Sequence, residues 1–313
     1  MTSVACVCPC CGDAFDAKPV GGHRILCGNA ATSADVEVVL AGERANVVFT
    51  SPPYASQRAY DKASGFKPIR PDEYVDWYRN IAANVMVALA DDGSYFMNIK
   101  EHCEDGQRHL YVKDLTIAHV RQWGWRFVDE FCWTRQGVPG TWLNRFKNGW
   151  EPVFHFTRSV KIKFRPDEVR HPSDDVYSYS PDNPKSKSGS GLLSNPGTGA
   201  DGMALPNNVL HVPTGGQRTS DEHAAAFPVG LPEFFVNAFS DPGDIVLDPF
   251  MGSGSTLIAA EKKGRRALGI EISPAYCDVI VARWQKVTGK RAVLASDGRC
   301  FDDLNAERER AAA

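Results

Sequence analysis

A short polar and aromatic sequence, Ser51-Pro52-Pro53-Tyr54, directly follows the mostly apolar run 45–50. Consecutive prolines supply no N–H donors, so the carbonyl groups around them are left to point into a cleft. The Ser51 hydroxyl and the Pro52 carbonyl could accept the two hydrogens of an exocyclic amine, while the Tyr54 ring stacks on the base that carries it. Taken alone, such a tetrapeptide is more often a simple turn at the end of a strand.

A second candidate loop spans residues 248–256, between an apolar run and a helical pattern. Gly252 and Gly254 permit a tight turn that lets a ligand approach the backbone closely, and Ser255 or Thr256 could cap the following helix. The loop lacks the Gly-Lys-Ser/Thr ending of a phosphate-binding loop. Because Asp248 would repel phosphates, a ligand that carries a cationic group, such as an amino acid or a sulfonium, fits better.

Glu271 stands at the end of the next apolar run, 266–271. A carboxylate at this place in an open α/β sheet can accept hydrogen bonds from ribose hydroxyls. The simpler alternative is a glycine turn followed by an ordinary carboxylate at a strand end.

The elements that must position these residues alternate along the chain. Seven short apolar runs predict buried strands at 23–27, 45–50, 93–99, 125–133, 151–157, 244–248 and 266–271. Helical patterns lie at 33–41, 71–90, 113–123, 231–239, 256–263 and 274–288. Such alternation predicts a doubly wound, mostly parallel α/β sheet that is covered on both faces. No helix separates 125–133 from 151–157, so these two strands are expected to pair antiparallel at one edge.

One region interrupts this pattern. Residues 166–216 are rich in Pro, Ser, Gly and Asn and show no periodicity, which in a compact domain indicates a functional or a disordered segment. We therefore divide the chain into a Cys-rich N-terminal segment (1–21), two halves of the α/β domain (22–165 and 217–295), the irregular region (166–216) and a C-terminal tail (296–313).

Charge is distributed unevenly. The net charge is −3, yet residues 131–165 hold seven basic residues and one acid, interleaved with aromatic residues. Such a surface neutralises phosphates and stacks bases, although a core hairpin with solvated lysines would look the same. The candidate DNA-binding residues are Arg135, Arg145, Lys147, Arg158, Lys161 and Lys163.

The nine cysteines form no disulfide framework. Cys8 and Cys11 have the spacing of a zinc knuckle, and with His23 and Cys27 they could form a tetrahedral structural zinc site. Against this set, His23 and Cys27 belong to a predicted strand, so a reduced tail without metal is the alternative.

The composition is that of an ordinary globular protein, with 43% hydrophobic and 23% charged residues. The sequence contains neither a signal-peptide pattern nor an apolar run long enough to span a membrane. We therefore expect a cytoplasmic protein. His102, His109 and His119 are interpreted as surface or packing residues.

Together, the two loops resemble those of the amino-group DNA methyltransferases. Ser51-Pro52-Pro53-Tyr54 is similar to the catalytic motif (Asp/Asn/Ser)-Pro-Pro-(Tyr/Phe/Trp) of that family, and residues 248–256 are similar to its cofactor loop. The catalytic motif comes first, as in the permuted class often called beta. Residues 26–30 and 223–239 resemble further cofactor-flanking segments, with Asn29 where the family commonly has Asp. The implied cofactor-binding residues are Asn29, Asp248, Pro249, Phe250, Gly252, Gly254, Ser255, Thr256 and Glu271.

The resemblance implies a seven-stranded, Rossmann-like methyltransferase sheet with an antiparallel edge hairpin, in which 166–216 is the target-recognition region. It also implies an enzyme that uses S-adenosylmethionine to methylate an exocyclic amine of a base flipped out of double-stranded DNA. Because Ser51 opens the motif, N4 of cytosine is favoured over N6 of adenine. More distant alternatives are methylation of RNA or of a protein amide, and a silent binder of cofactor or DNA. A cognate restriction endonuclease is a candidate partner.

Overall fold

A ten-stranded sheet forms the centre of the computed structural model, which describes residues 5–7, 22–55, 66–135, 144–172, 203–213 and 227–312. Its strand order is β11-β7-β8-β4-β3-β12-β13-β2-β1-β14. The seven inner strands are β2 (Arg24–Cys27), β3 (Ala45–Thr50), β4 (Leu89–Asn98), β7 (Arg126–Thr134), β8 (Trp150–Thr157), β12 (Ile245–Asp248) and β13 (Arg266–Glu271). Short strands extend both edges: β11 (Val209–Leu210), β1 (Ala5–Val7) and β14 (Val293–Leu294).

The direction of the strands matches the expectation from the sequence. β8 runs antiparallel to both of its neighbours, β4 and β7, whereas all other pairs in the large sheet are parallel. The seven inner strands coincide with the seven predicted runs. The mostly parallel sheet with an antiparallel edge hairpin is therefore confirmed.

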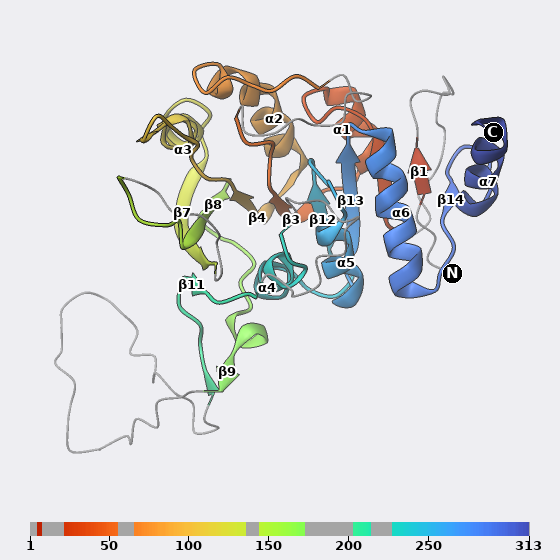
Figure 1. The fold of residues 1–313 in the computed structure, drawn as a ribbon. Coiled ribbons are helices and arrows are strands. Elements are labelled where there is room, and N and C mark those ends of the chain that lie inside the picture. The colour runs from red at the N-terminus through yellow and green to blue at the C-terminus, as the bar shows by residue number, and fades with distance from the viewer. Residues whose placement is uncertain are drawn as a thin grey trace.

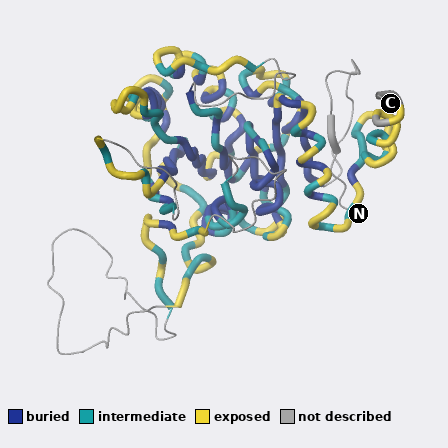
Figure 2. The backbone as a smooth tube through the Cα atoms, viewed as in Figure 1, coloured by how far each residue is buried: buried dark blue, intermediate teal, exposed yellow. Residues whose placement is uncertain are grey.

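Helices cover both faces of the sheet (Figure 1). One face packs against α1 (Ser33–Leu40), α2 (Tyr74–Ala88) and α3 (Tyr111–Arg121), and the other against α4 (Gly230–Phe239), α5 (Ser255–Lys262) and α6 (Pro274–Thr288). The strands between these layers are almost entirely buried (Figure 2). This explains why they read as continuous apolar runs rather than alternating ones.

Local signals in the sequence set the helix ends. α6, for example, begins where the Ser273 hydroxyl accepts a hydrogen bond from Tyr276 N, with Pro274 in the first turn. It ends at Gly289, which has a positive φ of 69°. All six predicted helices are present, with bounds that differ from the expected ones by a few residues.

Smaller elements were not expected from the sequence. They are the two-stranded pairs β5 (Cys103–Glu104) with β6 (Gln107–Arg108) and β9 (His171–Pro172) with β10 (Met203–Ala204), the 3-10 helix η3 (Pro166–Val169), and helix α7 (Phe301–Ala312) in the C-terminal tail. β1 also takes part of the Cys-rich N-terminal segment into the sheet, beside β2. None of the helices that the structure describes is long and apolar enough to cross a membrane.

Truncating a central core residue tests this packing. Phe235 on α4 is fully buried and contacts the rings of Phe49, Phe96 and Phe131. We expect Phe235→Ala to lower the free energy of unfolding by about 3–5 kcal/mol, because it leaves a cavity between helix and sheet. Urea denaturation measures this change. Phe146→Ala, at a ring that is 96% exposed, is the control and should change stability little; equal losses in both variants would contradict the packing.

Candidate active site and cofactor loop

The two candidate loops lie side by side at one edge of the sheet. β3 and β12 are neighbouring parallel strands, so their carboxyl ends meet. At this point the Thr50 hydroxyl donates a hydrogen bond of 2.7 Å to Asp248 Oδ1. Ser51 follows Thr50 directly, and the loop 249–254 follows Asp248. The structure therefore joins the two candidate motifs at the carboxyl ends of these neighbouring strands.

Asp248 organises the cofactor loop from inside. Its side chain is fully buried, and it accepts hydrogen bonds from Thr256 Oγ1 at 2.6 Å and from the Phe250 N–H at 3.0 Å, in addition to Thr50. Burial raises the pKa of Asp248 to about 6, although these hydrogen bonds oppose the shift. The carboxylate thus fixes the loop and the start of α5, which differs from the direct cofactor contact that we expected.

The turn in the loop depends on its glycines. Gly252 and Gly254 have positive φ values of 53° and 81°, a region that favours glycine. Gly254 is the N-cap of α5 and provides no side-chain cap. The expectation that Ser255 or Thr256 caps this helix is wrong, because the Ser255 hydroxyl donates to Phe227 O instead and Thr256 is engaged with Asp248.

The remaining loop residues pack inward. Pro249 is buried, and the half-buried Phe250 ring lies 6.0 Å from Trp77 and 6.3 Å from Tyr78, both on α2. Arg283 on α6, which the sequence did not single out, donates to Ser253 O at 2.9 Å. The loop is therefore held by helices from both faces of the sheet.

Glu271 stands beside this turn at the end of β13. Its carboxylate accepts hydrogen bonds from Gly252 N at 2.8 Å and Ser273 N at 2.9 Å. Burial raises its pKa, although these amides oppose the shift. β2 lies next to β13, and Gly28 N donates to Glu271 O at 2.9 Å. This contact places the exposed Asn29 close to Glu271, and the Asn29 side chain accepts a hydrogen bond from Ala31 N.

These residues fit S-adenosylmethionine. Each Glu271 oxygen accepts one backbone amide and keeps a lone pair that can accept from a ribose hydroxyl. Gly252 has no Cβ, and the space that a Cβ would take there is open except for Phe250 O at 3.9 Å, so a ligand can approach the backbone at this point. An acidic group at this edge also favours a ligand with a positive charge.

Hydrogen bonds from two tyrosines, Tyr74 on α2 and Tyr54 within the motif, fix the candidate catalytic motif. Tyr74 on α2 donates a hydrogen bond of 2.6 Å to Pro53 O. Among the residues that the structure describes, no donor is bound to Pro52 O, so this carbonyl can accept from a substrate. The Tyr54 hydroxyl donates to Glu151 Oε2 at 3.0 Å, and Ser51 lies close enough to the same hydroxyl to affect its pKa.

Glu151 is the centre of a buried polar cluster that the sequence analysis missed. Its side chain is only 3% exposed, and besides Tyr54 it binds Lys100 Nζ at 2.5 Å and the Arg135 guanidinium. Burial would raise the pKa of Glu151, but Lys100 and Arg135 outweigh that effect and hold it below its ordinary value. Burial and the charge of Glu151 raise the pKa of Tyr54 well above its usual range, so the phenol stays neutral. The signal was present in the sequence, since Glu151 is the one acid in the basic stretch 131–165.

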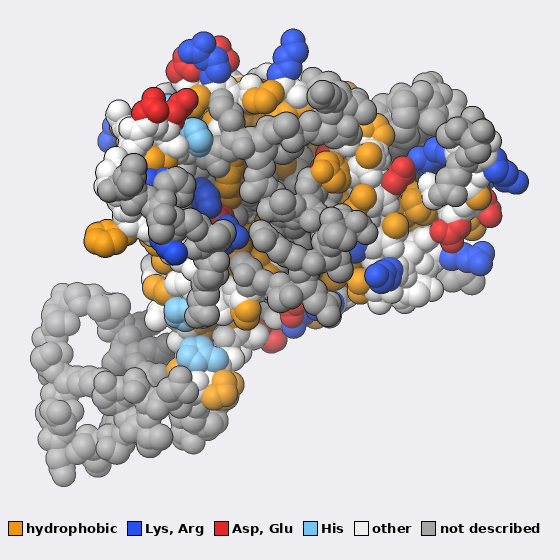
Figure 3. Space-filling model, in the orientation of Figure 1, with side chains coloured by type: hydrophobic (Ala, Val, Ile, Leu, Met, Phe, Trp, Pro, Cys, Tyr) orange, Lys and Arg blue, Asp and Glu red, His pale blue; other side chains and the backbone are white. Residues whose placement is uncertain are grey.

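The six candidate DNA-binding residues lie at two ends of β8 and do not form one surface. Arg135 is at the end that contacts Tyr54, where Trp150 pairs with Thr134, and Arg145 and Lys147 lie in the segment that leads into that end. Basic side chains gather over β7 and β8 in Figure 3.

The other three basic residues lie beyond the opposite end of β8. Arg158 donates to Leu89 O at the start of β4, and Lys163 binds Asp244 at 2.5 Å and Asp241 at 2.9 Å. Lys161 is exposed between them. Because β8 is antiparallel to β4, residues that follow it lie far from the carboxyl end of β3.

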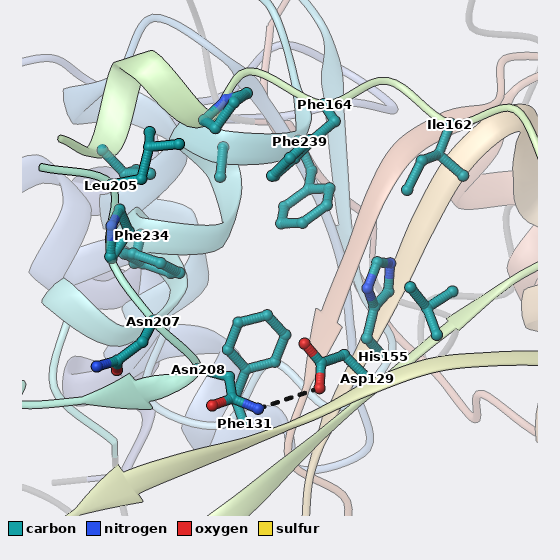
Figure 4. Close-up of a pocket in the computed structure, with 15 residues that line it drawn as sticks. Asp129, Phe131, His155, Ile162, Phe164, Leu205, Asn207, Asn208, Phe234 and Phe239 are labelled. Carbon is teal, nitrogen blue, oxygen red and sulfur yellow. Dashed lines mark hydrogen bonds between the residues drawn. The ribbon is translucent and has the colours of Figure 1, made fainter. Parts of the chain in front are cut away.

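A cavity of about 260 Å³ lies on the α4 side of the edge hairpin (Figure 4). Its walls include Phe131 and His155 from β7 and β8, and Phe234 and Phe239 from α4. Burial lowers the pKa of His155 to about 3, so this imidazole is neutral. Residues near both ends of the irregular region, 166–169 and 205–208, also line the cavity. The cavity thus lies at the base of that region, and no residue of the two candidate loops lines it.

The predicted zinc set is wrong for His23 and Cys27. Both lie at β2, and four residues along a strand span about 13 Å, too far for two ligands of one zinc ion. His23 is also fully engaged, because Nε2 binds Glu261 at 2.5 Å and Nδ1 accepts from Ala267 N at 2.8 Å. Cys8 and Cys11 lie outside the described residues.

The sequence matches known DNA methylases. Residues 45–282 match the model of the N6/N4 DNA methylase family. The type II methyltransferase M.PvuII of Proteus hauseri is 27% identical over 259 residues, which cover 75% of this chain and 76% of the relative. M1.MboII of Moraxella bovis is 30% identical over 189 residues, which cover 55% of this chain and 70% of the relative.

Solved structures show the same fold. The PvuII DNA methyltransferase, described as cytosine-N4-specific, superposes with a TM-score of 0.63 at 22% identity over 87% of this chain and 90% of that chain. The complex of M1.HpyAVI with SAM gives a TM-score of 0.53 at 17% identity over 83% and 98% of the two chains. The family match covers residues 45–282, which include both candidate motifs, and the hydrogen bond between Thr50 and Asp248 joins these motifs. The chain therefore belongs to the N6/N4 DNA methylase family and is a DNA methyltransferase.

Proposed function

We propose that this enzyme transfers the methyl group of S-adenosylmethionine to N4 of a cytosine flipped out of double-stranded DNA. The observation that carries the proposal is the position of Ser51-Pro52-Pro53-Tyr54 directly beside the cofactor loop, through the hydrogen bond between Thr50 and Asp248. The serine at the start of the motif and the similarity to a cytosine-N4-specific enzyme support cytosine as the target.

The target amine is a poor nucleophile because its lone pair is delocalised into the ring. Ser51 Oγ and Pro52 O accept its two hydrogens, which turns the nitrogen toward sp³ geometry and exposes the lone pair. The cofactor, when bound, supplies a methyl group that is already electrophilic. Most of the rate then comes from holding acceptor and donor in line. After the transfer, the surplus proton leaves to water.

Tyr54 stacks on the flipped base, and Glu151 positions Tyr54. Stacking of a base on an aromatic ring contributes about 1–3 kcal/mol. The hydrogen bond from the Tyr54 hydroxyl to Glu151 fixes the ring before the base arrives. Lys100 and Arg135 keep Glu151 ionised, so it remains an acceptor at neutral pH.

The cofactor site comprises the backbone at Gly252–Gly254, the carboxylate of Glu271 for the ribose and Asn29 for the adenine edge. Asp248 and Thr256 position this loop. On the DNA side, Arg135, Arg145 and Lys147 lie at the end of β8 nearest Tyr54 and suit phosphate contacts. Residues 209–211 of the proposed target-recognition region 166–216 lie beside this end of β7 and β8, because β11 pairs with Cys132 and Trp133 and the Thr134 hydroxyl contacts His211 Nδ1 at 2.9 Å. A cognate restriction endonuclease is the partner that a type II role requires.

Nucleoside mass spectrometry of DNA from cells that express the protein tests the target base. We expect N4-methylcytosine, and much less of it with the Ser51→Ala variant. N6-methyladenine would replace the cytosine proposal by its adenine alternative. If the DNA stays unmodified while RNA or protein gains methyl groups, DNA is not the substrate.

Replacing Ser51 by alanine removes one of the two acceptors for the amine. We expect turnover on duplex DNA to fall by about 100-fold or more, the scale of losing one preorganised hydrogen bond at a reacting group. Cofactor affinity, measured by calorimetry, should stay unchanged, since the Asp248 contacts do not involve this side chain. Ser33→Ala, at an exposed position on α1, is the matched control. Full turnover in Ser51→Ala would rule out the assigned role.

Glu151→Gln tests the positioning of Tyr54. Glutamine keeps an acceptor for the phenol but leaves Lys100 and Arg135 without their anion, so the ring is held less firmly. We expect kcat to fall by up to about 100-fold with unchanged cofactor affinity, and stability to fall by about 1–3 kcal/mol at pH 7.

The stability difference should depend on pH. Because the pKa of Glu151 is lowered in the folded state, its contribution is present above the ordinary glutamate pKa and is lost as the pH falls through the lowered value. Urea denaturation should therefore give a difference between wild type and Glu151→Gln that is constant near neutrality and shrinks in acid. Glu37→Gln, at an exposed residue of α1, should show neither effect. A difference that does not depend on pH would contradict the buried ion cluster.

A further inference from the structure

A small hairpin follows the carboxyl end of β4. β5 and β6 pair through Cys103 with Arg108 and Glu104 with Gln107, and His109 N donates to His102 O at 2.9 Å. Asp105 and Gly106 form the turn, with φ values of 48° and 79°.

Residues alternate between the two faces of a strand. His102 and Glu104 therefore share one face of the hairpin with His109 and Gln107 across from them, while Cys103 and Arg108 face the other way.

The shared face brings together three groups that bind metals. The ligand atoms of His102, Glu104 and His109 all lie within 4.8 Å of one another. The two imidazole rings are parallel within 5°, with centroids 5.6 Å apart, and His109 Nε2 lies 3.1 Å from Glu104 Oε2. The sequence analysis interpreted both histidines as surface or packing residues. Their convergence with a carboxylate indicates more than that.

We propose that His102, Glu104 and His109 bind a divalent transition-metal ion of the zinc class. Two imidazoles and one carboxylate form a known three-residue zinc set, and imidazole ligands select zinc, cobalt, nickel or copper over magnesium and calcium. Ligands around a tetrahedral zinc ion lie about 3.3 Å apart, given metal–ligand distances near 2 Å. The contact between His109 and Glu104 already has this length. Glu104 is 64% exposed, so its side chain is free to rotate toward His102.

The bound metal would stiffen a hairpin that contacts the segment preceding Glu151. On the opposite face Arg108 contacts Asn148, and a Cβ atom at Gly106 would meet the Asn144 side chain at 2.3 Å. The hairpin therefore supports residues 144–149, which lead into β8 and Glu151. Three protein ligands leave further coordination positions for water. This proposal is independent of the target base.

Cobalt titration of the full chain tests the site, because Co²⁺ reports its ligands by colour. The N-terminal cysteines would compete for the metal, so Cys6, Cys8, Cys10 and Cys11 are replaced by serine in every sample. We expect one Co²⁺ ion with weak visible absorption and without the ultraviolet band of thiolate ligands. Added Zn²⁺ should displace it and slow amide hydrogen exchange in residues 102–109.

Single substitutions on the exposed hairpin decide between binding here and binding elsewhere. His102→Ala and His109→Ala should each weaken Co²⁺ binding at least about tenfold, while thermal melting verifies that both variants fold. His171→Ala, at an exposed histidine of β9, is the matched control and should bind as the parent does. The proposal is overturned if the parent binds no metal, if both hairpin variants bind it unchanged, or if a thiolate band persists.

Discussion

The hydrogen bond between Thr50 and Asp248 is the contact on which the arrangement of the two candidate loops depends. Ser51 is adjacent to the donor, and the cofactor loop begins at the acceptor. Asp248 is fully buried and also orders the start of α5 through Thr256. A carboxyl group with a pKa near 6 in such a place is costly to bury. Its three donors offset part of that cost and hold the two motifs in a fixed relation.

A second buried carboxylate, Glu151, holds the candidate catalytic motif as Asp248 holds the cofactor loop. Glu151 links the edge hairpin of the sheet to Tyr54, while Tyr74 holds Pro53 from α2. The catalytic loop is thus attached to a helix on one face and to the antiparallel strand β8. Arg135, which the sequence analysis named as a candidate DNA-binding residue, and Lys100 keep this anion charged.

Periodicity was sufficient to predict the seven inner strands and the six helices that pack on them. Side-chain partners were harder to predict. Asp248 was expected to face a ligand, yet it is fully buried and bound by Thr50, Thr256 and the Phe250 amide. The sequence also did not show that Glu271 fixes the turn by accepting from Gly252 N and Ser273 N. The basic stretch is continuous in sequence, but β8 runs through its middle. The basic residues before β8 and those after it therefore lie at opposite ends of this strand. The hairpin 103–108 does have a local signal, the Asp105-Gly106 turn with positive φ at both residues, but its two-residue strands lack the alternating apolar pattern that would have predicted strands around it.

The order of the strands has a consequence for how this fold can change. Thr50 and Asp248 are 198 positions apart, yet their strands are direct neighbours. The irregular region lies within this interval and leaves the sheet beyond its edge hairpin, beside α4 (Figure 1). Chain inserted or exchanged between β9 and β10 need not alter the register of β3 against β12, because neither of these short strands belongs to the large sheet. If residues 166–216 recognise the target, as proposed above, new DNA sequence preferences can be acquired by grafting while the pairing of β3 with β12 is inherited intact.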